Sequence, residues 1–216
     1  MASVTLLYAT PLNLVQSGIR MCWNSQDKSD TRKHQLALSQ AAIIDDDFGF
    51  NPINNTGPKD LDLIDRIANK NKHSSVLRHS LFVFDIVAST KTLLAFTRHK
   101  VGVDFSVQST RYTTKKNASN LSYTSTENDY VNHLLGDIMG IVQEAINSGA
   151  ANDDIAMLLP QAFNYRFQVS MNLQAIQHFL DLRTTSHAHY DIREVANLIY
   201  EAMPQETKYL LEDQLH

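Results

Sequence analysis

The stretch LFVFDIVASTKTLLAFTRHKVGVDFSVQSTRY, residues 81–112, combines the strongest strand pattern of the sequence with a cluster of basic side chains. Its first seven residues, 81–87, are nearly all apolar and rich in aromatic and β-branched side chains, which predicts a strand. Ser89 is a typical helix N-cap, and a short helix follows it with apolar side chains at Leu93, Leu94 and Phe96. We therefore expect a strand that leads directly into a helix.

The helix ends in a strongly basic segment. Arg98-His99-Lys100 is followed by eight residues and then by Ser109-Thr110-Arg111-Tyr112. Arginine binds phosphate oxygens in pairs through its planar fork, and lysine adds a compact positive charge. The segment predicts a local binding site for an anion such as a nucleotide phosphate.

The rest of the chain predicts more helix than strand. Strands are expected at residues 4–9 and 163–171. Helices are expected at 13–22, 35–44, 59–71, 127–148, 172–183 and 188–203, with a short one after Pro204. Loops are expected at 24–34 and 45–58, and the Thr-, Ser-, Asn- and Lys-rich stretch 113–126 is expected to be a mobile loop. Residues 1–216 are thus predicted to form a single α+β domain.

Composition limits the functional classes. The net charge of −4 over 216 residues argues against a general nucleic-acid-binding protein, whose binding face is usually strongly basic. Cys22 is the only cysteine, so no intrachain disulfide forms and a reducing compartment is expected. No apolar stretch approaches membrane-spanning length, and the N-terminus has no signal-peptide pattern. We expect a soluble, cytoplasmic protein without a membrane partner.

Other chemistry has little support. The sequence contains no glycine-rich phosphate loop, G-x-S-x-G, H-E-x-x-H or C-x-x-C motif. His187 and His189 stand two residues apart, and on the expected helix they point in nearly opposite directions, so no metal site is predicted. Cys22 and Trp23 end an amphipathic helix and are expected in the core rather than in chemistry.

The basic segment resembles the R-H-R-x7-S-x-R signature of the flavin-dependent thymidylate synthases, the ThyX family. Four further stretches match in order and spacing, and together the five span nearly the whole chain. They are the helix end at residues 19–25, the H-x-[ST]-x-x-E-H segment at 73–79, the N-A-R…F-L-x-L-R helix at 172–183 and the S-H-A-x-x-E-I stretch at 186–192.

The resemblance implies an activity and a fold. The activity is methylation of dUMP to dTMP, with methylenetetrahydrofolate as the carbon donor and FAD reduced by NADPH as the hydride source. The implied fold is a compact, helix-rich α+β subunit with a small, mainly antiparallel sheet. The implied assembly is a homotetramer with active sites built between subunits.

The resemblance also implies site residues. Arg183 is expected to be catalytic, because a fixed cation beside the pyrimidine stabilises the charge that develops as C5 becomes nucleophilic. The expected cofactor-binding residues are Ser75, Arg78, Arg98, His99, Lys100, Asn172, Gln174 and His178. The expected substrate-binding residues are Arg98, Ser109, Thr110, Arg111 and Arg183. No protein nucleophile is needed.

Several positions depart from the family pattern. Lys100 replaces an arginine, and eight residues rather than seven precede Ser109, so either a bulge absorbs one residue or the loop is reshaped. Further departures, at positions implied to contact flavin or nucleotide, are Arg78, Val107, Ala156 and Gln174; His178 stands in place of an asparagine. Because an arginine is lost at 174 and gained at 78, we hypothesise that Arg78 supplies the missing guanidinium to the FAD phosphates. Two alternatives are a sister enzyme that modifies another pyrimidine nucleotide, such as UMP, and a degenerate homologue that binds a nucleotide without catalysis.

Overall fold

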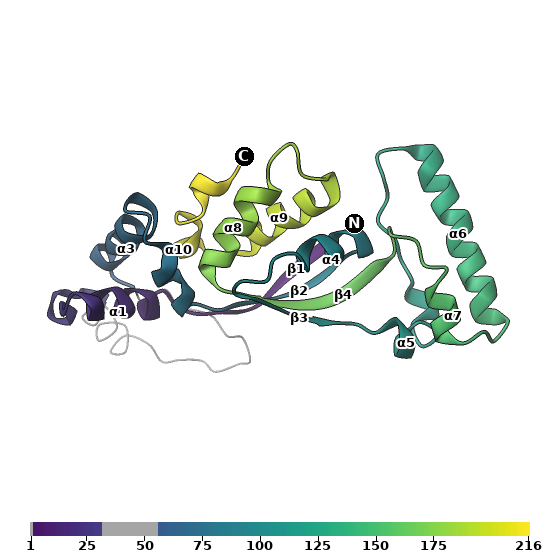
Figure 1. Ribbon diagram of the computed structural model, residues 1–216, viewed down its shortest axis with the longest axis horizontal. Coiled ribbons are helices and arrows are strands. Elements are labelled where there is room, and N and C mark those ends of the chain that lie inside the picture. The colour runs from purple at the N-terminus through teal and green to yellow at the C-terminus, as the bar shows by residue number, and fades with distance from the viewer. Residues whose placement is uncertain (1, 32–55) are drawn as a thin grey trace, which may run out of the picture.

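A four-stranded antiparallel sheet forms the centre of the molecule. The computed structural model describes residues 2–31 and 56–216. The helix expected at 35–44 and most of the loop expected at 45–58 lie outside these ranges. The strand order is β1-β2-β4-β3, with bounds Ser3–Ala9 for β1, Phe82–Ser89 for β2, Asn164–Met171 for β4 and Val103–Val107 for β3. The predicted α+β class with a small antiparallel sheet is confirmed (Figure 1).

One face of the sheet carries the core. Side chains alternate along β2, so Phe82, Phe84 and Ile86 are fully buried while their neighbours face the other side. Helices α8 (Leu173–Arg183) and α9 (Tyr190–Ala202) lie over the buried face, as Figure 1 shows. The opposite face bears polar side chains, including the paired Asp85 and Arg166.

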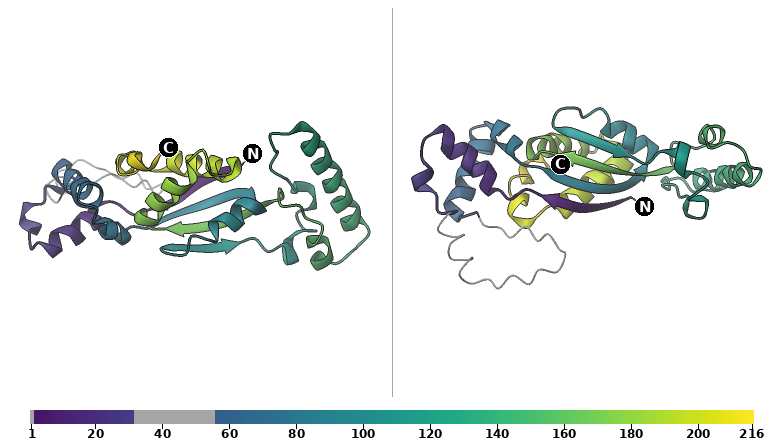
Figure 2. Two further views of the ribbon diagram at one scale, coloured as in Figure 1. Left: turned by 45° about the horizontal axis from the view of Figure 1, so that its top comes forward. Right: turned by 90° about the horizontal axis from the view of Figure 1, so that it is seen from below.

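Helices extend the molecule beyond both ends of the strands (Figures 1 and 2). At one end lie α1 (Asn13–Cys22) and α3 (Pro58–Asp65), the latter prolonged by a π-helical turn at Arg66–Lys70. At the other end lie α5, α6 and α7. The remaining bounds are Thr90–Phe96 for α4, Thr110–Thr113 for α5, Asp129–Asn147 for α6, Asn152–Ala156 for α7 and Gln205–Lys208 for α10.

Strand β3 was not predicted. Its residues lie between the two halves of the basic motif, where a loop was expected, but they pair with β4 from Val103↔Met171 to Val107↔Phe167 without a register shift. The additional residue of the motif is therefore not absorbed as a bulge in this strand. Of the two alternatives, a reshaped loop beside the strand agrees with the structure.

The stretch 113–126 is not simply a loop. Hydroxyl groups of Thr113 and Thr114 donate to the carbonyl oxygens of Ser109 and Thr110, one turn earlier. A 3-10 turn follows at residues 118–120, and the Thr124 amide donates to the Ala162 carbonyl, 2.8 Å away. Threonine-rich composition here reflects side chains that bond the local backbone, which composition alone does not distinguish from a loop.

Two smaller predictions were wrong. Trp23 is 72% exposed and Cys22 is also exposed, because the last turn of α1 buries Arg20 instead and the helix extends beyond the sheet. His187 lies in a turn and His189 is the N-cap of α9, so the helical geometry assumed for this pair does not apply.

Candidate functional site

Arg98, His99 and Arg183 form a cluster between the end of α4 and the end of α8. The Arg183 Nε donates a hydrogen bond to His99 Nε2 at 3.1 Å. The His99 ring is only 8% exposed and meets the ring of Phe179 edge-on, with centroids 5.1 Å apart. The exposed His178 approaches from the same helix, with its centroid 5.9 Å from that of His99.

A buried hydrogen-bond network fixes the helix that delivers this cluster. The Ser89 hydroxyl caps α4 by accepting from the Thr92 amide, and it donates to the buried carboxylate of Asp191. The Thr92 hydroxyl donates to the same Asp191 oxygen at 2.8 Å. This network anchors the start of α4 to the start of α9, while Phe96 at the other end of α4 stacks on Phe179. The position of Arg98 and His99 thus follows from core packing.

The cluster is electropositive, with a neutral imidazole at its centre. Burial, the Arg183 guanidinium and the neighbouring His178 lower the pKa of His99 from 6.5 to about 4. Burial, followed by the nearby charge of Arg98, also lowers the pKa of Arg183, although an arginine remains charged at physiological pH. An anionic ligand would relieve the repulsion between these guanidiniums.

A second polar cluster lies beside the start of α8. The Arg78 Nε donates to Gln174 Oε1 at 2.5 Å, and the Gln174 Nε2 donates to the Ser74 hydroxyl at 2.7 Å. These residues line a cavity of about 490 Å³ together with Ala68, Asn69, Lys72, Val101, Ala175, Gln177, His178, Asp181 and Gln214. The two positions of the hypothesised arginine exchange are thus in direct contact.

Asn172 and Ser75 flank this cluster in different ways. The Asn172 side chain accepts from the Ala175 amide as the N-cap of α8. Its backbone amide donates to the carbonyl of Gly102, which adopts a left-handed φ of 70° that glycine accommodates without strain. Ser75 is exposed on the 3-10 turn Ser74–His79, and Lys100 is exposed between His99 and β3.

Ser109, Thr110 and Arg111 lie apart from both clusters. They follow β3, at the opposite end from Gly102, and a five-residue strand spans about 17 Å. Arg111 pairs with Asp153 of α7 at 3.4 Å. Within residues 2–31 and 56–216, no hydrogen bond or ion pair joins Ser109 or Arg111 to Arg183. The two halves of the predicted nucleotide site therefore lie apart from each other within one subunit.

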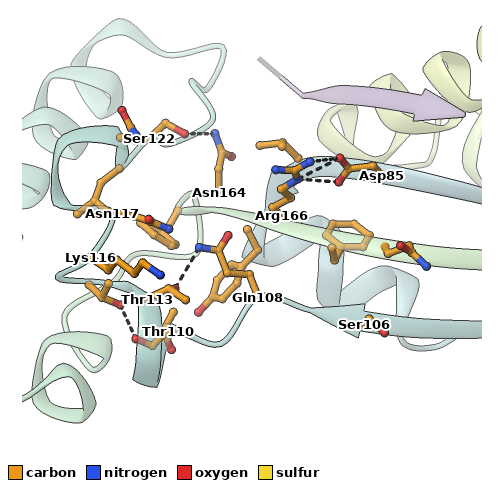
Figure 3. A pocket seen from close by; sticks show the side chains of 18 of the residues that line it. Asp85, Ser106, Gln108, Thr110, Thr113, Lys116, Asn117, Ser122, Asn164 and Arg166 are labelled. Atoms are coloured by element: carbon orange, nitrogen blue, oxygen red, sulfur yellow. Dashed lines mark hydrogen bonds and ion pairs between the residues drawn. The ribbon is translucent and has the colours of Figure 1, made fainter. Parts of the chain in front are cut away.

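A cavity of about 760 Å³ opens beside this second half, between the polar face of the sheet and residues 110–122 (Figure 3). The Gln108 side chain donates to the Thr113 hydroxyl at its rim, and Arg166 forms a forked pair with Asp85 on its floor. The cations Lys116 and Arg166 that line it were not predicted as site residues. The signal for Arg166 was that it is the only charged residue of the predicted strand 163–171, but its strand partner could not be identified from sequence.

The described parts of the chain contain no group of three His, Cys, Asp or Glu side chains arranged to hold a metal ion. In the same ranges, no helix combines the length and apolar character needed to cross a bilayer. The fold and the clusters define an α+β protein whose cationic side chains gather in separate clusters, an arrangement that suits anionic ligands.

Comparison with known proteins gives the family. The family model described as thymidylate synthase complementing protein, Thy1, matches residues 5–207. A flavin-dependent thymidylate synthase of Wolinella succinogenes is 30% identical over 221 residues, which cover 96% of each chain. One from Campylobacter jejuni strain RM1221 is 29% identical over 229 residues, covering 99% of this chain and 97% of the relative. The chain belongs to the Thy1 family, as the resemblance predicted.

Solved structures agree with this assignment. The flavin-dependent thymidylate synthase ThyX of Helicobacter pylori, solved with FAD and dUMP, superposes with a TM-score of 0.82 at 25% identity, covering 99% of this chain and 100% of that one. The UMP/dUMP methylase PolB of Streptomyces cacaoi superposes with a TM-score of 0.67 at 18% identity, covering 99% of this chain and 94% of that one. The second likeness shows a shared fold alone.

Proposed function

We propose that this protein is a flavin-dependent thymidylate synthase that converts dUMP to dTMP. Methylenetetrahydrofolate is the carbon donor, and FAD, reduced by NADPH, supplies the hydride when bound. The observation that carries the proposal is the partly buried hydrogen bond between Arg183 and His99, near Arg98, in a chain of this family. Arg183 is the proposed catalytic residue, because its fixed charge would stabilise the pyrimidine oxygen and nitrogen as C5 becomes nucleophilic.

The side chains around Arg78 suit a flavin dinucleotide. The cavity offers the cations Lys72 and Arg78 for a diphosphate, hydrogen-bonding groups from Ser74 and Gln174, and apolar surface from Val101. We propose that these residues, with Ser75, Asn172 and His178, hold FAD. Arg98, His99 and Lys100 remain proposed contacts on the nucleotide side of the cofactor.

Arg78 tests this assignment. Because Gln174 orients the Arg78 guanidinium at 2.5 Å, we expect Arg78→Ala to remove a charge-assisted bond and weaken FAD binding by roughly 10- to 100-fold. The measurement is the flavin-to-protein ratio after purification, followed by titration of the apoprotein with FAD. Arg66→Ala, at an exposed arginine outside this cavity, is the matched control. Equal FAD affinity in the wild type and Arg78→Ala would remove Arg78 from the cofactor site.

Self-association would complete the nucleotide site. We propose that Ser109, Thr110 and Arg111 of one subunit bind the nucleotide held by Arg98 and Arg183 of another, since one subunit separates them. The long helix α6 buries only Leu135 and Val142 within the subunit, while Tyr130, Leu134 and Ile141 remain exposed. A side chain at Gly140 on the same helix would meet no atom of the described residues within 4 Å of its Cβ, so nothing in the described subunit requires a glycine there. The proposed occupant of this surface is a second copy of the chain, within a homotetramer.

The absorbance spectrum of the purified protein tests the proposal as a whole. We expect a flavin spectrum that changes on addition of dUMP, and turnover of dUMP, but not of UMP or dCMP, with methylenetetrahydrofolate and NADPH. Product from UMP would instead favour the sister enzyme, and absence of flavin would favour the degenerate homologue. We also propose that the chain acts as one domain in the cytoplasm, supported by the family match across residues 5–207 and by its single cysteine.

A further inference from the structure

We propose that His99 is a positioning residue for Arg183, rather than only a contact to cofactor or nucleotide. Its Nε2 accepts the Arg183 Nε hydrogen bond at 3.1 Å and so fixes the plane of the guanidinium. The inference rests on the proposed function, in which Arg183 binds the pyrimidine.

The hydrogen bond determines the state of the imidazole. An imidazole nitrogen accepts only when it is unprotonated, so His99 must be neutral, with its proton on Nδ1. A protonated ring would place two donors against a guanidinium that has only donors. The groups that act on the ring electrostatically, Arg183 and His178 of α8, both favour its neutral form. The nearby charge of Arg98 acts on Arg183.

Engaging the Nε of Arg183 leaves its two terminal nitrogens free. Among the described residues, neither of these nitrogens has a hydrogen-bond partner, although Arg183 is only half-exposed. Their two parallel N–H groups match two adjacent acceptors, such as the O4 and deprotonated N3 of a uracil ring. His99 would therefore act at a distance, by holding this fork in the orientation that the pyrimidine edge requires.

The surrounding rings keep His99 in place for this role. The His99 ring contacts Phe179 edge-on, and Phe179 in turn stacks on Phe96, with ring centroids 4.4 Å apart. The ring is largely buried between α4 and α8, so little of it is available to a ligand. A group that served mainly to contact a ligand would present more of its surface.

Two substitutions distinguish the role of His99 as a hydrogen-bond acceptor from its role in packing. His99→Phe keeps an aromatic ring against Phe179 but removes the acceptor, whereas His99→Gln supplies an amide oxygen that can accept from Arg183. We expect His99→Phe to weaken dUMP binding to the flavin-loaded enzyme by 10- to 100-fold and to retain FAD. We expect His99→Gln to restore dUMP affinity to within a few-fold of the wild type. His187→Phe, at an exposed histidine in the turn that follows α8, is the control.

Calorimetric titration with dUMP and the flavin content of each variant decide the matter. Unchanged dUMP affinity in His99→Phe, or equal loss in Phe and Gln variants, would overturn the positioning role. Loss of FAD in His99→Phe would reassign His99 to the cofactor.

The ligand-free protein provides a readout that does not depend on the proposed function. In the wild-type protein, the ¹⁵N chemical shifts of His99 should show a protonated Nδ1 and an unprotonated Nε2 at neutral pH. This measurement needs no variant, so it remains possible if a substituted protein fails to fold. The opposite tautomer would contradict the inference whether or not dUMP is the substrate. If the tautomer is as expected but the wild type binds no dUMP, the proposed function fails while the contact stands.

Discussion

Protonation of His99 should lower the stability of the folded protein at acid pH. An unfolded histidine titrates near pH 6.5, whereas burial beside Arg183 and His178 lowers the pKa of His99 to about 4. Between these values the unfolded chain binds a proton that the folded chain does not. The free energy of unfolding should therefore fall as the pH drops from 6.5 to 4, by at most about 3 kcal/mol from this residue.

Urea unfolding at several pH values between 7 and 4 measures this loss. His99→Gln has no titrating group at this position, so its unfolding free energy should depend less steeply on pH over the same interval. Identical pH dependence in the two proteins would show that His99 is not held neutral.

At the same scale, single residues mark the limit of sequence-based prediction. The loss of an arginine at position 174 and the gain of one at position 78 led to the hypothesis that Arg78 supplies the missing guanidinium. The structure places these two residues in contact, although they are 96 positions apart. The hydrogen bond between His99 and Arg183, which are 84 positions apart, could not be found in this way. Both residues agree with the family pattern, so no departure from that pattern marks their contact. The sequence therefore yields candidate side chains for the site, but not the contact between His99 and Arg183.

At the scale of elements, a buried ion pair joins the end of α1 to the start of α3. The fully buried carboxylate of Asp60 accepts from the Arg20 guanidinium, and also from the Ser29 hydroxyl at 2.6 Å and from Thr31. Burial alone would raise the pKa of Asp60, but the hydrogen bonds from Ser29, Thr31 and Arg20 outweigh it and lower the pKa. The stabilisation by this carboxylate is therefore fully present above the pKa that Asp60 has in the unfolded chain. It is lost as the pH falls from that value through the lower pKa of the folded protein.

Asp60→Asn should destabilise the protein by about 3–5 kcal/mol, because it leaves the buried charge of Arg20 without its partner. Asp62→Asn, at an exposed position two residues on, should change the unfolding free energy by less than about 0.5 kcal/mol. Chemical denaturation at pH 7 compares the two variants. Similar stabilities would mean that the pair does not hold α1 and α3 together.

Prediction of elements succeeded where the pattern was long or strongly apolar. β2, α6 and α8 have such patterns, and all three were predicted close to their observed bounds. β3 also alternates, with Val103, Phe105 and Val107 separated by polar residues, but the basic motif around it favoured a loop. The short ladder with β4 that fixes this strand depends on residues about 65 positions later, which local periodicity does not report.

At the scale of the whole molecule, the α6 surface should control assembly. Replacing both Leu134 and Ile141 by lysine would place two charges on the proposed contact between subunits, where burial of unpaired charge is costly. We expect the tetramer to dissociate and turnover to be lost, while the helical circular dichroism is retained. Light scattering coupled to gel filtration gives the mass of the particle.

The control for this pair carries charges elsewhere on the same helix. Gln143→Lys with Asn147→Lys adds two lysines at positions outside the exposed apolar stripe and should leave the mass unchanged. A wild-type protein that is monomeric, or a doubly substituted Leu134 and Ile141 variant that remains tetrameric, would contradict the proposed surface.

The transfer of a labelled carbon shows directly whether this protein methylates dUMP. The purified protein is incubated with dUMP, NADPH, FAD and methylenetetrahydrofolate carrying ¹³C in its methylene group, and the nucleotide is analysed by mass spectrometry. We predict dTMP with the label in its C5 methyl group, formed by the wild type and not by Arg183→Ala. A protein that binds FAD and dUMP but forms no labelled dTMP would contradict the account.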